Sequence, residues 1–347
     1  GLDMLLVADL VHPGDSVLPD PNLRWLTGFS GSSGAAIVGP GVATFVTDFR
    51  YIERVREELG GFEISQAERQ LVPAVAKLLR GRVGFDEAHT SVKVFEGLQE
   101  ELDGSVDLVR SAGLVERLRR VKDEVELERM REAARLADQA VERVLEPGLA
   151  GRTEREVAGA YAAAIRELGC EPSFAAIVAA GPNGALPHAT PSDRVIGEGE
   201  LVVFDHGAIY EGYCSDGTRT FAAGEPDEES REVYDLVKRA QQAGLEAVRA
   251  GAIGRAVDAV ARDLISAEGH GEDFGHGLGH GVGVEVHEAP RLGQRSDDVL
   301  EAGNVVTVEP GVYVAGRVGV RIEDVGVVTE GGYENFSLTA KGLRVVG

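Results

Sequence analysis

The pattern of apolar and polar residues changes from segment to segment in the first third of the chain. Residues 2–9 and 82–86 are short apolar runs, which predict strands. Residues 71–80 and 92–102 repeat apolar positions at intervals of three and four, the spacing of one helix face. Because predicted strands and helices alternate in this way, we expect a separate α/β domain over residues 1–115.

A long amphipathic pattern opens the remainder of the chain. Residues 116–146 carry apolar side chains at helical spacing with charged residues between them, which predicts one long helix or two joined helices. Pro147 and Gly148 end this pattern. Further helical patterns follow at residues 154–168, 228–250 and 254–268. Segments rich in Val and Ile separate the helices in the order helix, helix, hairpin, helix, helix, hairpin. This order indicates an internal two-fold repeat within a second domain over residues 116–347.

The composition of the chain indicates where in the cell the protein is expected. The 347 residues, 43% of them hydrophobic, are enough for two domains with cores of their own. No apolar run approaches the ~20 residues that span a bilayer, and the first residues lack the basic start of a signal peptide. The two cysteines, Cys170 and Cys214, do not suggest a disulfide framework, which suits a reducing compartment. We therefore predict a cytoplasmic protein with no membrane partner.

The net charge of the chain indicates the salt conditions to which the protein is adapted and the kinds of molecule that it can bind. The net charge is -23, and five of the 35 basic residues are lysine. The acidic residues are spread along the chain, which differs from the acidic block of a disordered tail. Such a surface favours a halophilic source, because counterions at high salt screen its self-repulsion. A polyanion would be repelled, so a nucleic acid is not expected as a partner.

Four carboxylates and one imidazole follow one another in separate short motifs: Asp205, Asp216, His280, Glu309 and Glu323. Asp205 follows an apolar strand pattern, where an unpaired buried charge would be costly. Glu309 and Glu323 also close apolar strands. Gathering this much negative charge requires cations, and two divalent metals that share bridging carboxylates would balance it. The five residues therefore predict a hydrolytic two-metal site.

Histidines near this set leave a second interpretation open. His276, His280 and His287 lie within twelve residues and could form a three-histidine zinc site. That site would leave four buried acids unexplained. His206 adjoins Asp205 on a predicted strand, so its side chain is expected on the opposite face and in a structural role.

The order and flanks of these motifs resemble the pita-bread metallopeptidases, the family of prolidase, aminopeptidase P and methionine aminopeptidase. Residues 22–38, NLRWLTGFSGSSGAAIV, resemble the start of the creatinase-like N-terminal domain of that family. The amphipathic segment LRRVKDEVELERMREAARLAD resembles the helix that opens its catalytic domain. The resemblance implies an α+β fold, with a smaller α/β creatinase-like domain followed by a pita-bread domain.

The resemblance also implies a role for each ligand. Asp205 would chelate one metal, and His280 and Glu309 would chelate the other. Asp216 and Glu323 would bridge the two ions. Glu309 would shuttle the proton as well. Because four ligands are oxygen and one is nitrogen, Mn²⁺ is the first choice of metal, with Co²⁺ or Zn²⁺ as alternatives.

Further residues are assigned by the same resemblance. His188 and His287 would contact the substrate and steady the tetrahedral intermediate. Three residues around the ligands would support them: His276, Tyr313 and Arg321. Members of the family usually form homodimers, so a homodimer is expected here.

The substrate expected from the resemblance is a peptide with proline in the second position. The N-terminal domain argues against methionine aminopeptidase. Arg291, four residues after His287, could hold the free carboxylate of a dipeptide, which favours an Xaa-Pro dipeptidase. Aminopeptidase P, which acts on longer peptides, is the alternative. Creatinase-like enzymes and peptide- or histone-binding modules on this fold typically lack some of the five ligands, whereas a metal-dependent lyase would keep them.

Overall fold

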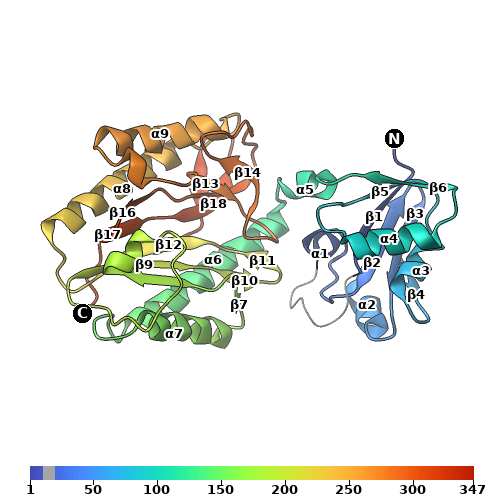
Figure 1. Ribbon diagram of the computed structural model, residues 1–347, viewed down its shortest axis with the longest axis horizontal. Helices are drawn as coiled ribbons and strands as arrows, with labels where there is room; N and C mark the ends of the chain where they lie inside the picture. Colours follow the sequence, from blue (N-terminus) through green and yellow to red (C-terminus); the bar gives the residue numbers. More distant parts are fainter. Residues whose placement is uncertain (11–19) are drawn as a thin grey trace. The chain divides into compact units, whose positions relative to one another are not determined.

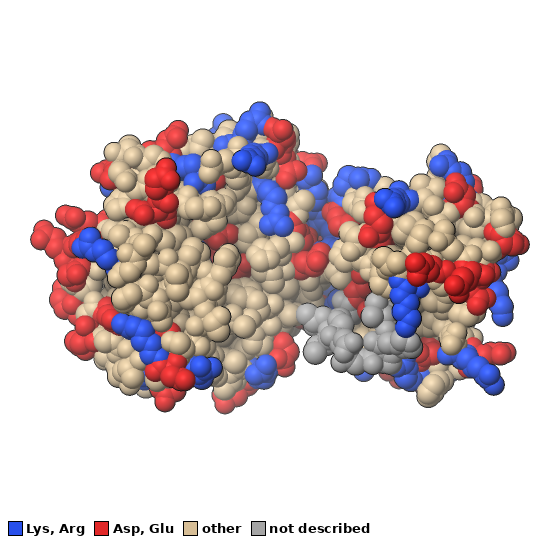
Figure 2. Space-filling model, viewed as in Figure 1, with Lys and Arg blue, Asp and Glu red and all other residues tan. Residues whose placement is uncertain are grey.

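The computed structural model describes residues 1–10 and 20–347. The chain divides into two compact units, Gly1–Arg119 and Arg120–Gly347, and Figure 1 colours both along the sequence. Among the described residues, no helix combines the length and the apolarity needed to cross a membrane. On the face drawn in Figure 2, acidic side chains are scattered over the surface and do not gather in one patch.

The first unit is built on one mixed sheet. Its described strands are β1 (Met4–Asp9), β2 (Gly34–Gly39), β3 (Val42–Thr47), β4 (Glu63–Gln66), β5 (Gly81–Phe85) and β6 (Val106–Arg110). They lie in the order β4-β3-β2-β1-β5-β6, with parallel pairing at both edges. Its described helices are α1 (Pro21–Thr27), α2 (Ile52–Glu58), α3 (Leu71–Ala76), α4 (Val92–Glu101) and α5 (Leu114–Arg119). Apolar clusters include Leu6 and Ile37 in one group and Val7 and Phe45 in the other, so both faces of the sheet are buried.

Four long helices frame the second unit: α6 (Glu124–Leu145), α7 (Glu154–Glu167), α8 (Glu228–Ala247) and α9 (Gly254–Ala267). Short 3₁₀ turns lie at η1 (Gly181–Ala185) and η2 (Gly271–Asp273). Of the two alternatives predicted for residues 116–146, the structure has two helices, α5 and α6, because α6 has its own start. There the Asp123 carboxylate accepts the N–H of Glu126, and the Glu126 carboxylate accepts the N–H of Asp123.

The strands of the second unit repeat one arrangement. They are β7 (Glu171–Pro172), β8 (Ile177–Ala180), β9 (Glu200–His206), β10 (Ala208–Tyr210), β11 (Tyr213–Cys214), β12 (Gly217–Ala223), β13 (Gly279–Gly281), β14 (Glu288–Leu292), β15 (Val305–Val308), β16 (Gly311–Val314), β17 (Val318–Arg321), β18 (Asp324–Val328) and β19 (Tyr333–Asn335). The antiparallel pair β9–β12 follows α6 and α7, and the pair β15–β18 follows α8 and α9. This is the predicted order, and Figure 1 shows the two helix pairs on opposite sides of the strands.

Side chains alternate between the two faces of β9, and this alternation places Asp205 on the side of the strand that faces α8 and α9. Val202 and Phe204 belong to the apolar core of α6 and α7, whereas Leu201 belongs to the core of α8 and α9. Successive side chains of a strand point to opposite faces, so Asp205 lies on the face of Leu201. His206 lies on the other face and packs against the rings of Tyr161 and Phe204. The packing agrees with the structural role expected for His206.

Candidate metal centre

The two strand pairs bring their carboxylates to one place. Asp205 lies opposite Thr218 in the β9–β12 pair, and Asp216 immediately precedes β12. Glu323 immediately precedes β18, and its N–H donates to the carbonyl of Thr218 at 3.0 Å. The hydroxyl of Thr218 also donates to Oε2 of Glu323 at 2.7 Å. Thr218 therefore joins the halves directly beside three of the predicted ligands.

His280 completes the group from β13. Its Nε2 lies 3.1 Å from Oε1 of Glu309 and 3.7 Å from Oδ2 of Asp216. Its Nδ1 lies 3.1 Å from the carbonyl of Gly281. A cation bound at Nε2 would require the ring proton to be on Nδ1, where the carbonyl of Gly281 can accept it. Ligand atoms of Asp216, His280 and Glu323 all lie within 4.8 Å of one another in buried surroundings.

Glycines let the backbone around His280 pack closely. A Cβ on Gly279 would lie 2.0 Å from the carbonyl oxygen of Thr307, and a Cβ on Gly281 would lie 2.3 Å from that of Ala289. Neither contact is possible for a larger residue. The hydroxyl of Thr307 accepts the N–H of His280 at 3.1 Å and donates to Oε1 of Glu309 at 3.1 Å. Thr307 thus contacts two of the predicted ligands, which the sequence did not indicate.

The buried carboxylates around His280 would be stabilised in their charged form by additional positive charge. Burial raises the pKa of Asp205 and raises the pKa values of Asp216 and Glu323 well above their ordinary values, and neighbouring carboxylates add to each shift. Burial also acts to raise the pKa of Glu309, but the hydrogen bond and charge of His280 outweigh it and lower the pKa to about 2. Within the described residues, Oδ1 of Asp205 and Oε1 of Glu323 are buried without a hydrogen-bond partner. Buried, unpartnered carboxylate oxygens around one imidazole suit divalent cations.

The predicted supporting residues form one chain of hydrogen bonds to this group. Arg321 donates from Nη2 to Oδ2 of Asp205 at 2.6 Å and from Nη1 to the hydroxyl of Tyr313 at 3.0 Å. Nε2 of His276 lies 3.0 Å from the same hydroxyl. His276 is therefore engaged with Tyr313, and no three-histidine cluster occurs among the described ligand atoms. The three-histidine zinc interpretation has no support in this geometry.

The residues expected to contact substrate lie at the exposed side of the group. The ring of His287 is 4.4 Å from that of His280, and His287 and His188 are both exposed. Partial burial and the charge of His280 lower the pKa of His287, and the charges of Arg291 and His188 add to this effect. Arg291 is exposed on β14 and lines an open pocket of about 800 Å³ together with His276.

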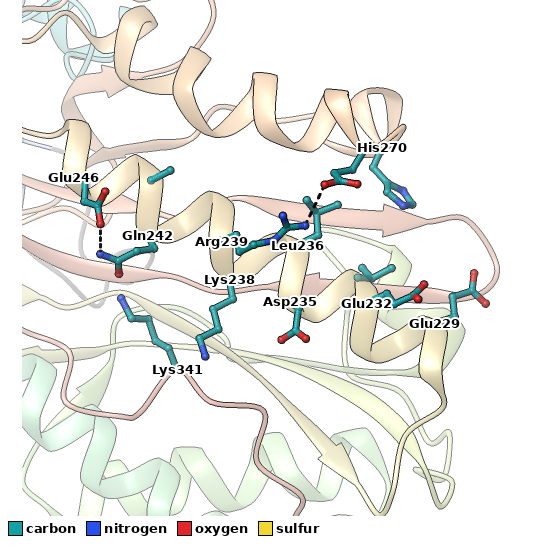
Figure 3. A pocket seen from close by; sticks show the side chains of 13 residues that line it. Glu229, Glu232, Asp235, Leu236, Lys238, Arg239, Gln242, Glu246, His270 and Lys341 are labelled. Carbon is teal, nitrogen blue, oxygen red and sulfur yellow. Dashed lines mark hydrogen bonds and ion pairs between the residues drawn. The ribbon is translucent and has the colours of Figure 1, made fainter.

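Two other features lie apart from this group. A pocket of about 1070 Å³ along α8 is lined by charged side chains such as Glu232, Lys238 and Lys341 and contains none of the predicted ligands (Figure 3). In the first unit, ligand atoms of Asp86, His89 and Glu116 also lie within 4.8 Å of one another. The sequence did not predict this second cluster, because Glu116 is far from Asp86 and His89 in the chain and the three residues follow no motif.

Comparisons with known proteins cover nearly the whole chain. The family described as Metallopeptidase family M24 matches residues 128–330, and the Creatinase/Prolidase N-terminal domain matches residues 1–121. The chain is 34% identical to an Xaa-Pro dipeptidase of Pyrococcus horikoshii over 95% of its length and 94% of that protein. The structure of an Xaa-Pro dipeptidase from Bacillus anthracis is 39% identical, with a TM-score of 0.93 over 99% of this chain and 95% of that one. An X-Pro aminopeptidase from Thermotoga maritima is 33% identical, with a TM-score of 0.92 over 99% and 98%.

Proposed function

The chain belongs to metallopeptidase family M24, and we propose that it hydrolyses Xaa-Pro bonds, chiefly in dipeptides. The predictions of a metallopeptidase and of a pita-bread fold with a creatinase-like N-terminal domain are confirmed. The dipeptidases of P. horikoshii and B. anthracis support the proposed substrate class. We keep the predicted boundaries as part of the proposal, with residues 116–347 carrying catalysis and residues 1–115 forming the accessory domain.

One observation carries the proposal: carboxylates from two strand pairs are buried around His280, and two of their oxygens have no hydrogen-bond partner in the part of the chain that the structure describes. We propose that Asp205 holds one cation, that His280 and Glu309 hold the second, and that Asp216 and Glu323 bridge them. The oxygen-rich donor set favours Mn²⁺, with Co²⁺ or Zn²⁺ as alternatives. When bound, two divalent ions supply Lewis acidity for amide hydrolysis.

The protein side chains would then divide the remaining work. Glu309 would carry a proton from the attacking water to the proline nitrogen, because its carboxylate stays ionised beside His280. His287 and His188 would donate to the substrate oxygen that gains charge. Tyr313, Arg321 and His276 would keep Asp205 in place through the chain of hydrogen bonds that ends on its carboxylate.

Arg291 supports a preference for dipeptides. Its exposed side chain lines the pocket beside His276, where a guanidinium could hold the free carboxylate next to proline. A longer peptide has no carboxylate at that place. An X-Pro aminopeptidase activity is the second candidate, and the similarity to the T. maritima protein supports it.

The deciding experiment compares Ala-Pro with Ala-Pro-Ala in high salt with Mn²⁺. We expect a higher kcat/KM for the dipeptide in the native protein, and we expect Arg291→Gln to remove that preference through KM. Arg295→Gln is the matched control, because Arg295 is another exposed arginine of the same pocket. A native preference for the tripeptide would make the protein an aminopeptidase, and no cleavage of either peptide would leave a lyase or other hydrolase on this fold.

Three further proposals extend the prediction. The dispersed acidic surface supports activity in molar salt, which a salt titration of kcat/KM would test. A homodimer is proposed from the family resemblance, and light scattering at high and low salt would test it. A cytoplasmic location stays a prediction that cell fractionation would test.

A further inference from the structure

An ion pair within α9 lies outside the candidate metal centre. Asp258 and Arg262 are one helical turn apart, and their side chains are 1% and 13% exposed. Nε of Arg262 donates to Oδ2 of Asp258 at 2.7 Å, and Nη2 donates to Oδ1 at 2.9 Å. Such a paired contact fixes the plane of the guanidinium. A buried ion pair often adds little stability compared with apolar packing. The role of this pair is therefore inferred from the other groups that Asp258 and Arg262 contact.

Those contacts hold one short segment, residues 274–278. Arg262 donates from Nη1 to the carbonyl of Phe274 at 2.7 Å and from Nη2 to the carbonyl of His276 at 2.6 Å. Oδ1 of Asp258 accepts the N–H of Leu278 at 3.0 Å. The guanidinium also lies over the ring of Phe274, 4.1 Å from its centre. Three alternate residues are thus held by one ion pair, which we call the α9 clamp.

The segment held by the α9 clamp leads to the metal centre along two routes. The carbonyl of Leu278 accepts the N–H of Glu309 at 2.8 Å, and His280 follows two residues later. On the other route, the ring of Phe274 packs edge-on against that of His276, which contacts the hydroxyl of Tyr313. A shift of the segment would therefore move a ligand, the proposed proton carrier and the hydrogen bonds that end on Asp205.

We propose that Arg262 and Asp258 are positioning residues, which act on the reaction through Glu309, His280 and His276. The proposal rests on the proposed function, since it assigns the α9 clamp to that same site. Lysine could not replace Arg262, because one ammonium cannot match the planar fork that reaches a carboxylate and two carbonyls together. Figure 1 shows α9 at the outside of the second unit, so the α9 clamp would act from the helix layer through the backbone of residues 274–278.

Conservative variants test the proposal. We expect Arg262→Lys and Asp258→Asn to lower kcat for the Xaa-Pro dipeptide about 10–100-fold with a smaller change in KM, the usual cost of losing support behind a ligand. Cobalt added to metal-free protein gives an absorption spectrum without any peptide. That titration should show about tenfold weaker binding in both variants. Arg239→Gln is the control, because Arg239 forms an exposed ion pair with Glu268 at 3.3 Å on the neighbouring helix surface.

Chemical rescue separates positioning from simple loss of structure. Arg262 lines the open pocket, so guanidinium ions can reach its place in Arg262→Ala. We expect millimolar guanidinium to restore part of kcat and the native cobalt spectrum, whereas sodium chloride at the same ionic strength should restore neither. Should Arg262→Ala fail to fold, the spectrum and kcat of Arg262→Lys decide the question.

Native kcat and a native cobalt spectrum in Arg262→Lys would overturn the α9 clamp as a positioning device. So would a loss of activity that matches the loss of folded protein and does not respond to guanidinium. Failure of the proposed function looks different. The native protein would then bind cobalt and cleave no Xaa-Pro peptide, while the variants would still differ from it in the cobalt titration.

Discussion

The two units each gather an aspartate, a histidine and a glutamate within 4.8 Å, yet the two clusters differ in how their charge is balanced. In the first unit, the amide of Asn22 donates to Asp86 at 3.1 Å and to Glu116 at 2.8 Å. Nδ1 of His89 lies 2.7 Å from Asp86. Partial burial acts to raise the pKa of Asp86, but the hydrogen bond to His89, the N–H of Ala88 and the charge of His89 bring it below its ordinary value.

In the second unit, the cluster of Asp216, His280 and Glu323 has no such balance. Burial raises the pKa of both carboxyls, and Oε1 of Glu323 is buried without a partner among the described residues. The residue types are the same, so type and proximity alone do not identify a cation site. A cation site is indicated when buried carboxylates lack enough hydrogen-bond donors and positive charges from the protein, because a bound cation must then balance their negative charge.

The largest test removes a bridging carboxylate. We expect Asp216→Ala and Glu323→Ala to lower kcat/KM at least about 10³-fold, because each change would remove a carboxylate that we propose is shared between two cations. Metal content measured by mass spectrometry should fall as well. Glu116→Ala is the matched change in the first cluster and should keep native activity and metal content. Comparable loss in Glu116→Ala would erase the distinction between the clusters.

A smaller loss of activity is expected when the hydroxyl of Thr218, which contacts Glu323 and Arg321, is removed. Thr218→Val keeps the side-chain shape but loses the hydrogen bond to Glu323 and the one accepted from Nε of Arg321 at 3.0 Å. We expect kcat/KM to fall about 10–100-fold, the usual cost of losing such a contact. Thr27→Val is the control, since its hydroxyl bonds a helix carbonyl in the first unit. Native kinetics in Thr218→Val would show that Glu323 holds its place without this contact.

In metal-free protein, a rise in pH should change the contributions of the two clusters to folding stability in opposite directions. The raised pKa values of Asp205, Asp216 and Glu323 mean that the folded state binds more protons than the unfolded state. Their stabilising effect is therefore present below the ordinary carboxyl pKa of about 4 and is lost as pH rises through the raised values. For Asp86 the sign is opposite, with stability lost as pH falls through its lowered pKa.

A thermal melt series from pH 5 to pH 8 after chelation measures this effect. We expect Tm to fall by several degrees as pH rises, and Mn²⁺ to reverse the fall at pH 8. Because the acidic surface also repels itself at high pH, Glu323→Gln is needed as a reference, and it should show a flatter series. Equal slopes in the two proteins would mean that surface repulsion alone accounts for the change.

The smallest effect is expected in the first cluster. Asp86→Asn should cost about 1 kcal/mol of unfolding free energy, because it weakens hydrogen bonds to a charged carboxylate at a partly exposed site. Urea denaturation would measure this, and kcat/KM should stay native. A loss of metal content in this variant would show that the first cluster also binds a cation.

The motifs predicted a set of residues that the folded chain brings together, since ligand atoms of Asp216, His280 and Glu323 lie within 4.8 Å of one another and Glu309 lies beside His280. Asp205 and Glu323 stand at the ends of apolar strands, and that local pattern already marks a buried charge. Short edge strands were harder, since β4 and β6 have few residues and are held by parallel pairing with distant segments. The contacts of Thr307 and Arg262 could not be predicted at all. They are made to backbone groups that only the folded chain brings within reach.

The glycines on both sides of His280 limit how this protein can evolve. At both positions the obstacle to a larger residue is a backbone carbonyl, which cannot turn aside as a side chain can. A library randomised over this stretch should return glycine at 279 and 281 in every active clone. We therefore expect altered cation preferences or rates to arise from substitutions on other strands, or on α9 through the segment that its ion pair holds, with both glycines kept.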